Sequence, residues 1–224
     1  MPTHSSDALV LRAYPYGEAD CIVVFLTADQ GKKRGVAKNG IKSRRRFGAA
    51  LEPLTRGTAT YVEREHRELV RLDRIEAVSS PMRSSSPARP LDANALAHAA
   101  YFAELLSEWA PDGHADERLF RLGTAVADAL GEAASVDSLA RYFEYWLLRL
   151  EGVYPATELN GTLSDEAMAF LKSAAVKAPA EMTSVHVGTR ALREIERVHQ
   201  RLITIHLEKE VRSARVVREM RPPS

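Results

Sequence analysis

The sequence predicts an α+β protein with two domains, a small five-stranded barrel followed by an all-helical domain. Two observations lead to this prediction. The first eighty residues contain short runs of apolar, β-branched and aromatic residues between turn signals, which is typical of a small barrel. Beyond residue 90 the apolar residues recur at i, i+3 and i+4, which indicates amphipathic helices.

Five short strands are predicted in the first domain, residues 1–80. The clearest is residues 20–27 (DCIVVFLT), whose β-branched and aromatic side chains suit a buried strand. Asp29-Gln30-Gly31 then gives a hairpin signal, and Pro53 indicates an edge or a bulge in a later strand. The predicted strands cover residues 8–11, 20–27, 35–38, 51–61 and 68–75.

A helical domain is predicted for residues 81–224, after a linker at residues 79–90 that is rich in Ser, Pro and Arg. Ser164 is a predicted N-cap, because two acidic residues follow it in the first turn. The predicted helices cover residues 91–109, 116–130, 138–150, 164–171 and 189–206. The first of them is expected to turn one stripe inward, formed by Leu96, Ala99, Ala100, Ala103 and Leu106.

The composition excludes several classes of protein. The chain has 224 residues, of which 45% are hydrophobic and 27% are charged, so a buried core is expected and disorder is not. It contains no apolar run of about 18 residues, and its N-terminus does not resemble a secretory signal. Cys21 is the only cysteine, which excludes an intramolecular disulfide and a multi-cysteine zinc site. A cytoplasmic protein is expected.

Positive charge is concentrated in one segment of the sequence. The net charge is +1, but residues 1–80 and 190–224 each carry +4, whereas residues 91–189 carry −9. Residues 31–48 contain eight basic side chains and no acidic one, so no local counter-charge is expected. A polyanion is the natural ligand of such a run, because each phosphate contact releases counterions. The candidate nucleic-acid-binding residues are Lys32, Lys33, Arg34, Lys38, Lys42, Arg44, Arg45 and Arg46.

The alternative for this basic run is a solvated loop without a ligand. The flanking glycines and Phe47, as a stacking ring, favour nucleic acid. A second basic stretch lies near the C-terminus and either extends the nucleic-acid surface or caps the acidic helical domain. It consists of Lys209, Arg212, Arg215, Arg218 and Arg221.

The sequence contains no known catalytic motif, so neither an enzyme nor a bound cofactor is expected. His199 and His206 are interpreted as surface histidines rather than metal ligands, and Cys21 as a buried, inert thiol. The aromatic side chains between residues 142 and 146 are expected to pack in the core.

Several blocks of the sequence resemble the bacterial RecO recombination-mediator family. In the first domain these are residues 8–11, 16–20, 26–27, 31, 36–40 and 45–54. In the second they are residues 101–105, 141–144, 147–148 and 152–155. The order and spacing of the blocks are specific, and the similarity covers essentially the whole chain.

The resemblance implies that the barrel is an OB-fold and that the protein is a recombination mediator in DNA repair. Such a protein binds single- and double-stranded DNA and anneals complementary single strands without a nucleotide cofactor. Its expected partners are RecR and the single-stranded DNA-binding protein SSB, and with RecR it helps to load RecA onto SSB-coated strands. A location at the bacterial nucleoid follows from this role. For the SSB tail, Arg141 and Arg149 are the candidate residues, the alternative being exposed arginines that pair with Glu144 or Glu151.

The sequence departs from the family at one point. Many members carry a four-cysteine zinc site in the region that corresponds to residues 156–184, where this chain has no cysteine. We therefore expect no metal there, and only a short helix and loop around residues 156–184.

Two other functions remain open from the sequence. An OB-fold also serves RNA-binding proteins, and a basic loop can dock an acidic protein in a purely structural adaptor. Competition between matched DNA and RNA strands distinguishes the first alternative, and binding to polyanions distinguishes the second.

Overall fold

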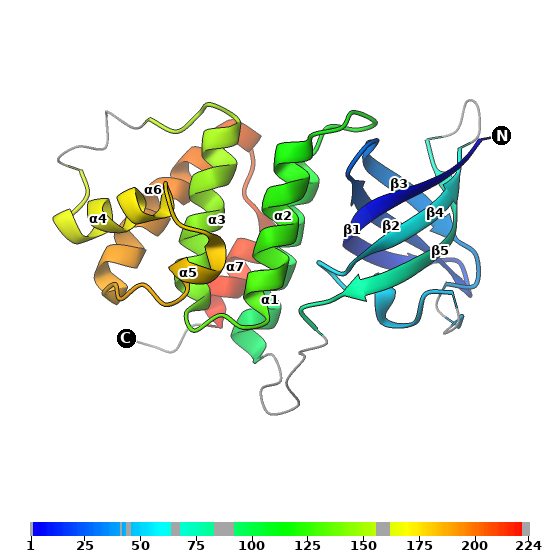
Figure 1. Ribbon diagram of the computed structural model, residues 1–224, viewed down its shortest axis with the longest axis horizontal. Coiled ribbons are helices and arrows are strands. Elements are labelled where there is room, and N and C mark those ends of the chain that lie inside the picture. The colour runs from blue at the N-terminus through cyan, green and yellow to red at the C-terminus, as the bar shows by residue number, and fades with distance from the viewer. Residues whose placement is uncertain are drawn as a thin grey trace.

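A computed structural model describes residues 2–40, 42–43, 46–63, 68–82, 92–155 and 162–220. A β-barrel and a helical domain lie side by side, the barrel on the right in Figure 1 and the helices on the left. The predicted fold class is confirmed.

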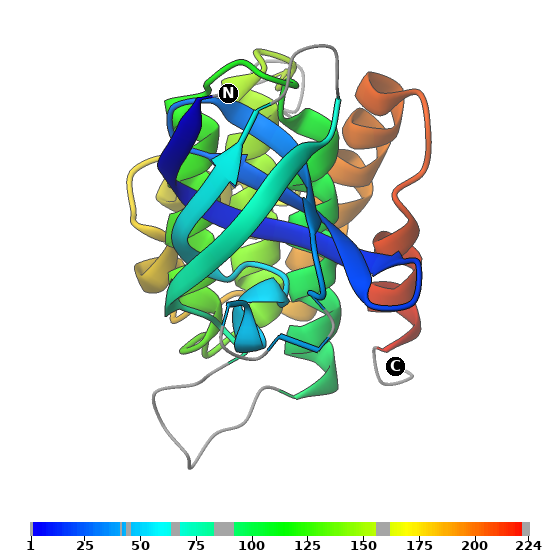
Figure 2. The same ribbon diagram turned by 90° about the vertical axis from the view of Figure 1, so that its right-hand side faces the viewer.

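The barrel contains the strands β1 (Thr3–Tyr16), β2 (Asp20–Thr27), β3 (Gly31–Ala37), β4 (Arg56–Val62) and β5 (Val70–Ser79). It closes in the order β1-β2-β3-β5-β4, with β4 pairing again with β1. The β3–β5 pair is parallel and the other pairs are antiparallel. This is the five-stranded architecture of an OB-fold, and Figure 2 shows it from the side facing away from the helices.

The strand predictions differ most from the structure before β4. Residues 51–61 were predicted as one strand, but Gly48–Leu51 form a 3-10 helix and β4 begins only at Arg56. Pro53 has no N–H to donate to a ladder, and Leu54 adopts a left-handed φ of 60°. The turn is held instead by the Leu54 amide, which donates to the Val10 carbonyl at 2.7 Å.

The strand β2 is buried on both sides. Cys21, Val23 and Phe25 point into the barrel, so Cys21 is buried as predicted. Val24 and Leu26 point outward and belong to the core that the barrel shares with the helices. The continuous apolar run of β2 therefore reflects cover on both faces rather than the alternation of a half-exposed strand.

The helical domain follows the barrel in the chain. In the described residues its helices are α1 (Ala93–Trp109), α2 (Glu117–Leu130), α3 (Val136–Leu150), α4 (Asp165–Ala174), α5 (Pro179–Met182), α6 (Thr189–Leu207) and α7 (Arg212–Glu219). Side-chain oxygens of Asp92, Asp116, Ser135 and Ser164 cap the first four of them. The predicted cap at Ser164 is confirmed.

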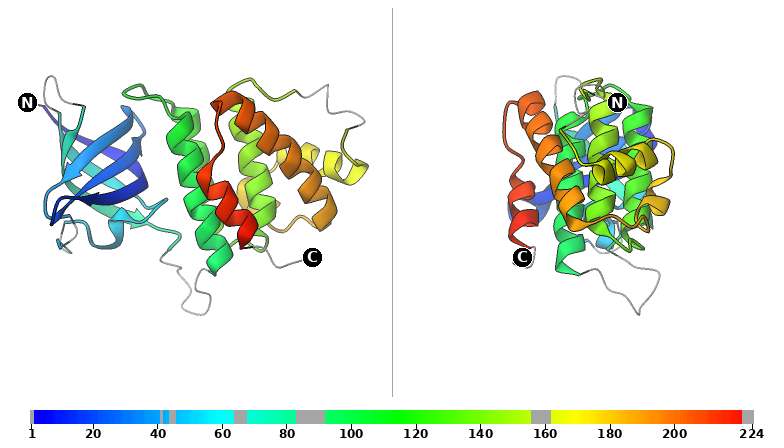
Figure 3. Two further views of the ribbon diagram at one scale, coloured as in Figure 1. Left: turned by 180° about the vertical axis from the view of Figure 1, so that it is seen from behind. Right: turned by 90° about the vertical axis from the view of Figure 1, so that its left-hand side faces the viewer.

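The helix α1 has a much wider buried surface than the sequence predicts. Leu96 and Ala100 of the predicted stripe are exposed, whereas Tyr101, Phe102 and Leu105 are buried. The reason is that α1 is packed between β1 on one side and α2, α3 and α7 on the others. Figure 3 shows α7 alongside α1 on the face that is hidden in Figure 1.

Backbone hydrogen bonds join the two domains directly. The Lys32 amide donates to the Pro111 carbonyl at 3.2 Å, and the Gly113 amide donates to the Lys32 carbonyl at 3.3 Å. Gly31, with φ of 66°, lies so close to the His114 backbone that a Cβ atom would come within 2.0 Å of its carbonyl oxygen. The α1–α2 connection therefore acts as a short extension of the sheet beside β3.

Candidate nucleic-acid interface

The predicted basic run is divided between a strand and a connection. Lys32, Lys33 and Arg34 lie within β3, and Lys38, Lys42 and Arg46 follow it. Arg44 and Arg45 lie outside the described residues. Successive residues of a strand point to opposite faces, so the run does not present its charges on one surface.

The basic run has no counter-charge in its own segment, as expected, but the fold brings carboxylates to it from other segments. Lys33 is only 13% exposed and contacts Glu63 at 2.6 Å. Lys38 contacts Asp20 at 2.8 Å. Each lysine donates a hydrogen bond to its carboxylate, which lowers the pKa of Glu63 and of Asp20. Both acids are distant from the run in sequence and are brought to it by strand pairing.

Lys32 also has a structural partner. Its Nζ donates to the Ser107 carbonyl at 2.7 Å, near the end of α1, and lies 3.4 Å from Asp112. Its side chain is 16% exposed. Lys32 therefore ties the barrel to the helical domain.

Phe47 does not supply the predicted stacking ring. It is 3% exposed and belongs to the interior of the barrel. Arg46 lies over this ring, 5.3 Å from its centroid, and its guanidinium donates to the Lys38 carbonyl. Both residues stabilise the connection after β3.

An exposed cluster of a different composition lies on the outer surface of β1 and β3. The Arg34 guanidinium donates to the Tyr14 hydroxyl at 3.3 Å, and the Arg12 guanidinium lies 5.4 Å from the centroid of the same ring. The hydrogen bond to Tyr14 raises the pKa of Arg34. Among the described residues, neither guanidinium has a carboxylate within ion-pair distance. We call Arg12, Tyr14 and Arg34 the outer cluster.

The strand register explains how the outer cluster forms. Arg12 pairs with Val24, and Val24 pairs with Arg34, so the two arginines lie in one row across β1, β2 and β3. Arg12 and Tyr14 are not among the predicted site residues, because the predicted first strand ends at residue 11 whereas β1 continues to Tyr16. The alternation of residues 12, 14 and 16 along a longer strand was the available signal.

A groove of about 460 Å³ continues from the outer cluster along β3. It is lined by Tyr16, Val36, Lys38, Glu68, Leu69, Val70 and Arg71. A second groove, of about 610 Å³, shares Glu68 and Val70 with it and extends past Arg34 to Asp112. OB-folds bind oligonucleotides on this surface, between the β1–β2 and β4–β5 connections.

Comparison with known proteins agrees with this architecture. A family model described as "Recombination protein O N terminal" matches residues 1–81, and one described as "Recombination protein O C terminal" matches residues 90–160. The chain is also 33% identical over 177 residues to a DNA repair protein RecO from Syntrophotalea carbinolica, a match that covers 77% of this chain and 67% of that protein. The chain belongs to the RecO family.

Other RecO relatives are more similar over a shorter region. A DNA repair protein RecO from Koribacter versatilis is 44% identical over 150 residues, or 67% of this chain and 59% of that protein. A DNA repair protein RecO from Anaeromyxobacter sp. is 40% identical over 147 residues, a match that covers 66% of this chain and 56% of that protein. These matches span less than two thirds of the relatives' length. In the described part of the chain, no helix has the length and apolar character needed to cross a membrane.

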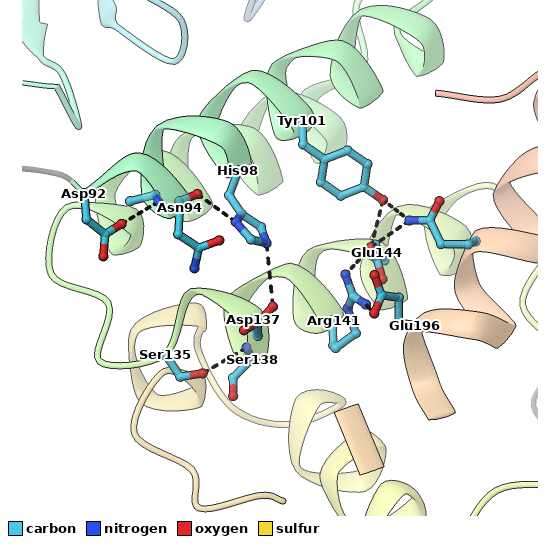
Figure 4. A network of polar contacts seen from close by, with 12 residues as sticks. Asp92, Asn94, His98, Tyr101, Ser135, Asp137, Ser138, Arg141, Glu144 and Glu196 are labelled. Atoms are coloured by element: carbon cyan, nitrogen blue, oxygen red, sulfur yellow. Dashed lines mark hydrogen bonds and ion pairs between the residues drawn. The ribbon is translucent and has the colours of Figure 1, made fainter. Parts of the chain in front are cut away.

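The RecO resemblance predicts Arg141 as a contact of the SSB tail, but the structure places this residue in the helical core. Arg141 is 1% exposed. Its guanidinium contacts Glu144 at 2.8 Å and Glu196 at 3.4 Å (Figure 4). The expectation that Arg141 is exposed on α3 is wrong, although its pairing with Glu144 was the stated alternative.

Three further polar groups contact the carboxylate of Glu144. The Tyr101 hydroxyl donates to it at 2.7 Å, Gln200 donates at 3.3 Å, and His199 Nδ1 lies 3.0 Å away. His199 is fully buried, so its interpretation as a surface histidine is wrong. We call Tyr101, Arg141, Glu144, Glu196 and His199 the inner cluster. It arises because α1, α3 and α6 each direct polar side chains to one point, which no local sequence pattern reveals.

Arg149, the second candidate for the SSB tail, is exposed, and its guanidinium contacts aromatic side chains of the same helix. It donates to the Tyr145 hydroxyl at 2.7 Å, and its guanidinium lies 5.5 Å and 5.7 Å from the ring centroids of Tyr145 and Trp146. Arg141 and Arg149 therefore do not form one accessible cationic pair. The prediction that aromatic side chains of α3 pack in the core is confirmed.

The C-terminal basic stretch contacts acidic residues of the helical domain. Lys209 pairs with Glu108 at 2.6 Å, and Arg215 pairs with Glu219 at 2.8 Å. The amides of Arg212 and Ser213 donate to Glu104. The Lys209 contact agrees with the alternative in which the stretch caps the acidic helices, whereas the Arg215 pair lies within α7. The side chains of Arg212, Arg215 and Arg218 are exposed, and Arg221 lies outside the described residues.

Proposed function

We propose that this RecO-family chain acts in DNA repair by binding single-stranded DNA on the outer surface of its barrel and annealing complementary strands. The observation that carries the proposal is the outer cluster, where Arg12 and Arg34 are exposed and neither forms an ion pair among the described residues. Arginine beside an aromatic ring is a typical combination in proteins that bind single strands without sequence preference.

The physical role of the cluster is electrostatic. Two single strands repel each other through their phosphates, and a cationic surface lowers that repulsion when both strands lie near it. Phosphate contacts of this kind carry no sequence information. No covalent bond is made or broken in this role, so the protein acts without catalysis and without a nucleotide.

The proposed partners extend this role to repair. With RecR, the chain helps to load RecA onto strands that are coated with SSB. The test is the annealing of two complementary SSB-coated oligonucleotides, measured with and without this chain and with and without RecR. Acceleration without ATP is the expected result. Unchanged annealing in all mixtures contradicts the mediator role.

A double variant tests the DNA surface itself. Arg12→Ala together with Arg34→Ala removes two phosphate contacts, so the slope of log Kobs against log salt decreases by up to about 1.4 for a single strand. The measurement is a salt titration of oligonucleotide binding by fluorescence anisotropy. Equal slopes for the variant and the unchanged chain contradict the assignment.

The matched control carries the same change of charge elsewhere on the barrel. Arg56→Ala together with Arg74→Ala removes two arginines on β4 and β5, each of which contacts its own carboxylate, Asp7 or Glu76. The control is expected to keep nearly the original slope. A control that behaves like the first variant means that net charge alone determines binding.

A further inference from the structure

The groove at the end of β1 has an apolar lining that the phosphate-binding role does not use. Tyr16, Val36, Leu69 and Val70 line it, and Tyr16 is 51% exposed although it is a large aromatic residue. The volume of about 460 Å³ lies within the range of pockets that enclose small organic ligands, roughly 300–1,000 Å³.

The charges around this groove argue against a phosphate as its occupant. Lys38 contacts Asp20 at 2.8 Å, and Arg71 contacts Asp73 at 2.9 Å. Glu68 adds a further carboxylate to the lining. The two cations are thus already paired within the barrel, and the lining as a whole suits a flat, neutral group with polar edges.

Arg34, one of the two exposed arginines of the outer cluster, lies beside the groove. Arg34 belongs to the second groove, which shares Glu68 and Val70 with the first. Arg34 and Val36 are successive outward positions of β3, so they lie about 7 Å apart along the strand. A single strand that follows β3 therefore meets a phosphate-binding position and an apolar position in succession.

We propose that the groove binds an unpaired nucleobase stacked on Tyr16, and that this contact makes the barrel select single-stranded over double-stranded DNA. The inference rests on the proposed function and assigns its substrate class. A base in a duplex is stacked and paired on both sides, so it reaches Tyr16 only after it leaves the helix, at a cost in unstacking. A base of a single strand enters without that cost.

Binding to three nucleic acids of equal length distinguishes the contribution of the base from that of the phosphate backbone. They are an oligo-dT strand, an abasic strand with the same phosphates, and a duplex. Stacking one base on an aromatic ring contributes roughly 5- to 150-fold in affinity. Tyr16→Ala in the full chain is therefore expected to weaken binding of oligo-dT by roughly tenfold or more, with unchanged affinity for the abasic strand and the duplex.

Two control variants accompany this measurement. Tyr16→Phe keeps the ring and is expected to bind oligo-dT as the unchanged chain does. Val78→Ala removes another exposed apolar side chain of the barrel, outside the groove, and is expected to have no effect. Because Tyr16 is exposed, the thermal midpoint of the Tyr16→Ala variant is expected to remain the same.

The outcomes are distinguishable. An equal loss for oligo-dT and the abasic strand overturns the inference, because Tyr16 then acts through the backbone. If the Tyr16→Ala variant binds all three nucleic acids as the unchanged chain does, the inference is also overturned. The groove is then better suited to an apolar side chain of a protein partner. Failure of the proposed function looks different, since the unchanged chain then shows no salt-dependent binding to any of the three ligands.

Discussion

The inner cluster of the helical domain and the outer cluster of the barrel both combine arginine with tyrosine, but they differ in their acidic neighbours. Arg141 meets Glu144 and Glu196 and is enclosed by three helices. Arg12 and Arg34 contact the ring and hydroxyl of Tyr14 and remain exposed, and the carboxylates of Glu68 and Asp112 act on Arg34 without forming an ion pair with it among the described residues. Whether an arginine is committed to the fold or left for a ligand thus depends on the carboxylates that lie within a few ångströms of it, which for Arg141 are Glu144 on its own helix and Glu196 on α6.

The largest effect is expected when the inner cluster loses its arginine. Arg141→Ala leaves the buried carboxylate of Glu144 without its cation, and breaking a buried pair in this way costs about 3–5 kcal/mol of unfolding free energy. The measurement is the urea midpoint. Arg149→Ala, at an exposed site on the same helix, is the control and is expected to change the midpoint far less. Equal midpoints for both variants contradict the contrast between the clusters.

The inner cluster is also expected to make stability depend on pH. Burial lowers the pKa of His199 below its usual 6.5, against the opposing effect of the Glu144 carboxylate, and burial lowers that of His98 in the same way. The folded state therefore binds fewer protons than the unfolded state once the pH falls below about 6.5. Stability is fully present above that pH and decreases as the pH falls toward the lowered values.

The urea midpoint, measured at about pH 7.5, 6.5 and 5.5, reports this dependence. The lowered carboxylate pKa values of Asp20, Glu63 and Glu194 affect stability only near and below their ordinary values of 3.8 and 4.5, outside this window. His199→Gln removes one titrating group and is expected to flatten the curve. A midpoint that is constant across the window rules out this role for the histidines.

A smaller effect is expected within the basic run itself, where Lys32 and Lys38 both lie beside an aspartate but the Lys32 side chain is far less exposed. Lys32→Ala removes a charged hydrogen bond to the Ser107 carbonyl at the contact between the domains, which costs on the order of 1–3 kcal/mol. Lys38→Ala removes an exposed pair with Asp20, and no measurable change in the midpoint is expected. Hydrogen exchange of the Lys32 and Gly113 amides locates the change, and protection that is the same in both variants contradicts it.

Much of the architecture followed from local patterns. The strand at residues 20–27 and the helix at residues 116–130 agree with β2 and α2 almost to the residue, because a β-branched run and an i, i+4 stripe are local signals. The error before β4 has a local cause as well, since Pro53 and the left-handed Leu54 form a turn inside an otherwise strand-like run. The cover of α1 by the barrel, in contrast, has no local signal.

The candidate site divides in the same way. The sequence by itself determined the barrel, the helices and a surplus of positive charge in residues 31–48, because composition and periodicity record them. Only the tertiary structure decided which charges remain available. Pairing of β2 with β3, closure of the barrel and docking of the α1–α2 connection bring Asp20, Glu63 and Asp112 to Lys38, Lys33 and Lys32. Ion pairs act over a few ångströms in space, and the distance along the chain between such partners leaves no mark in the sequence.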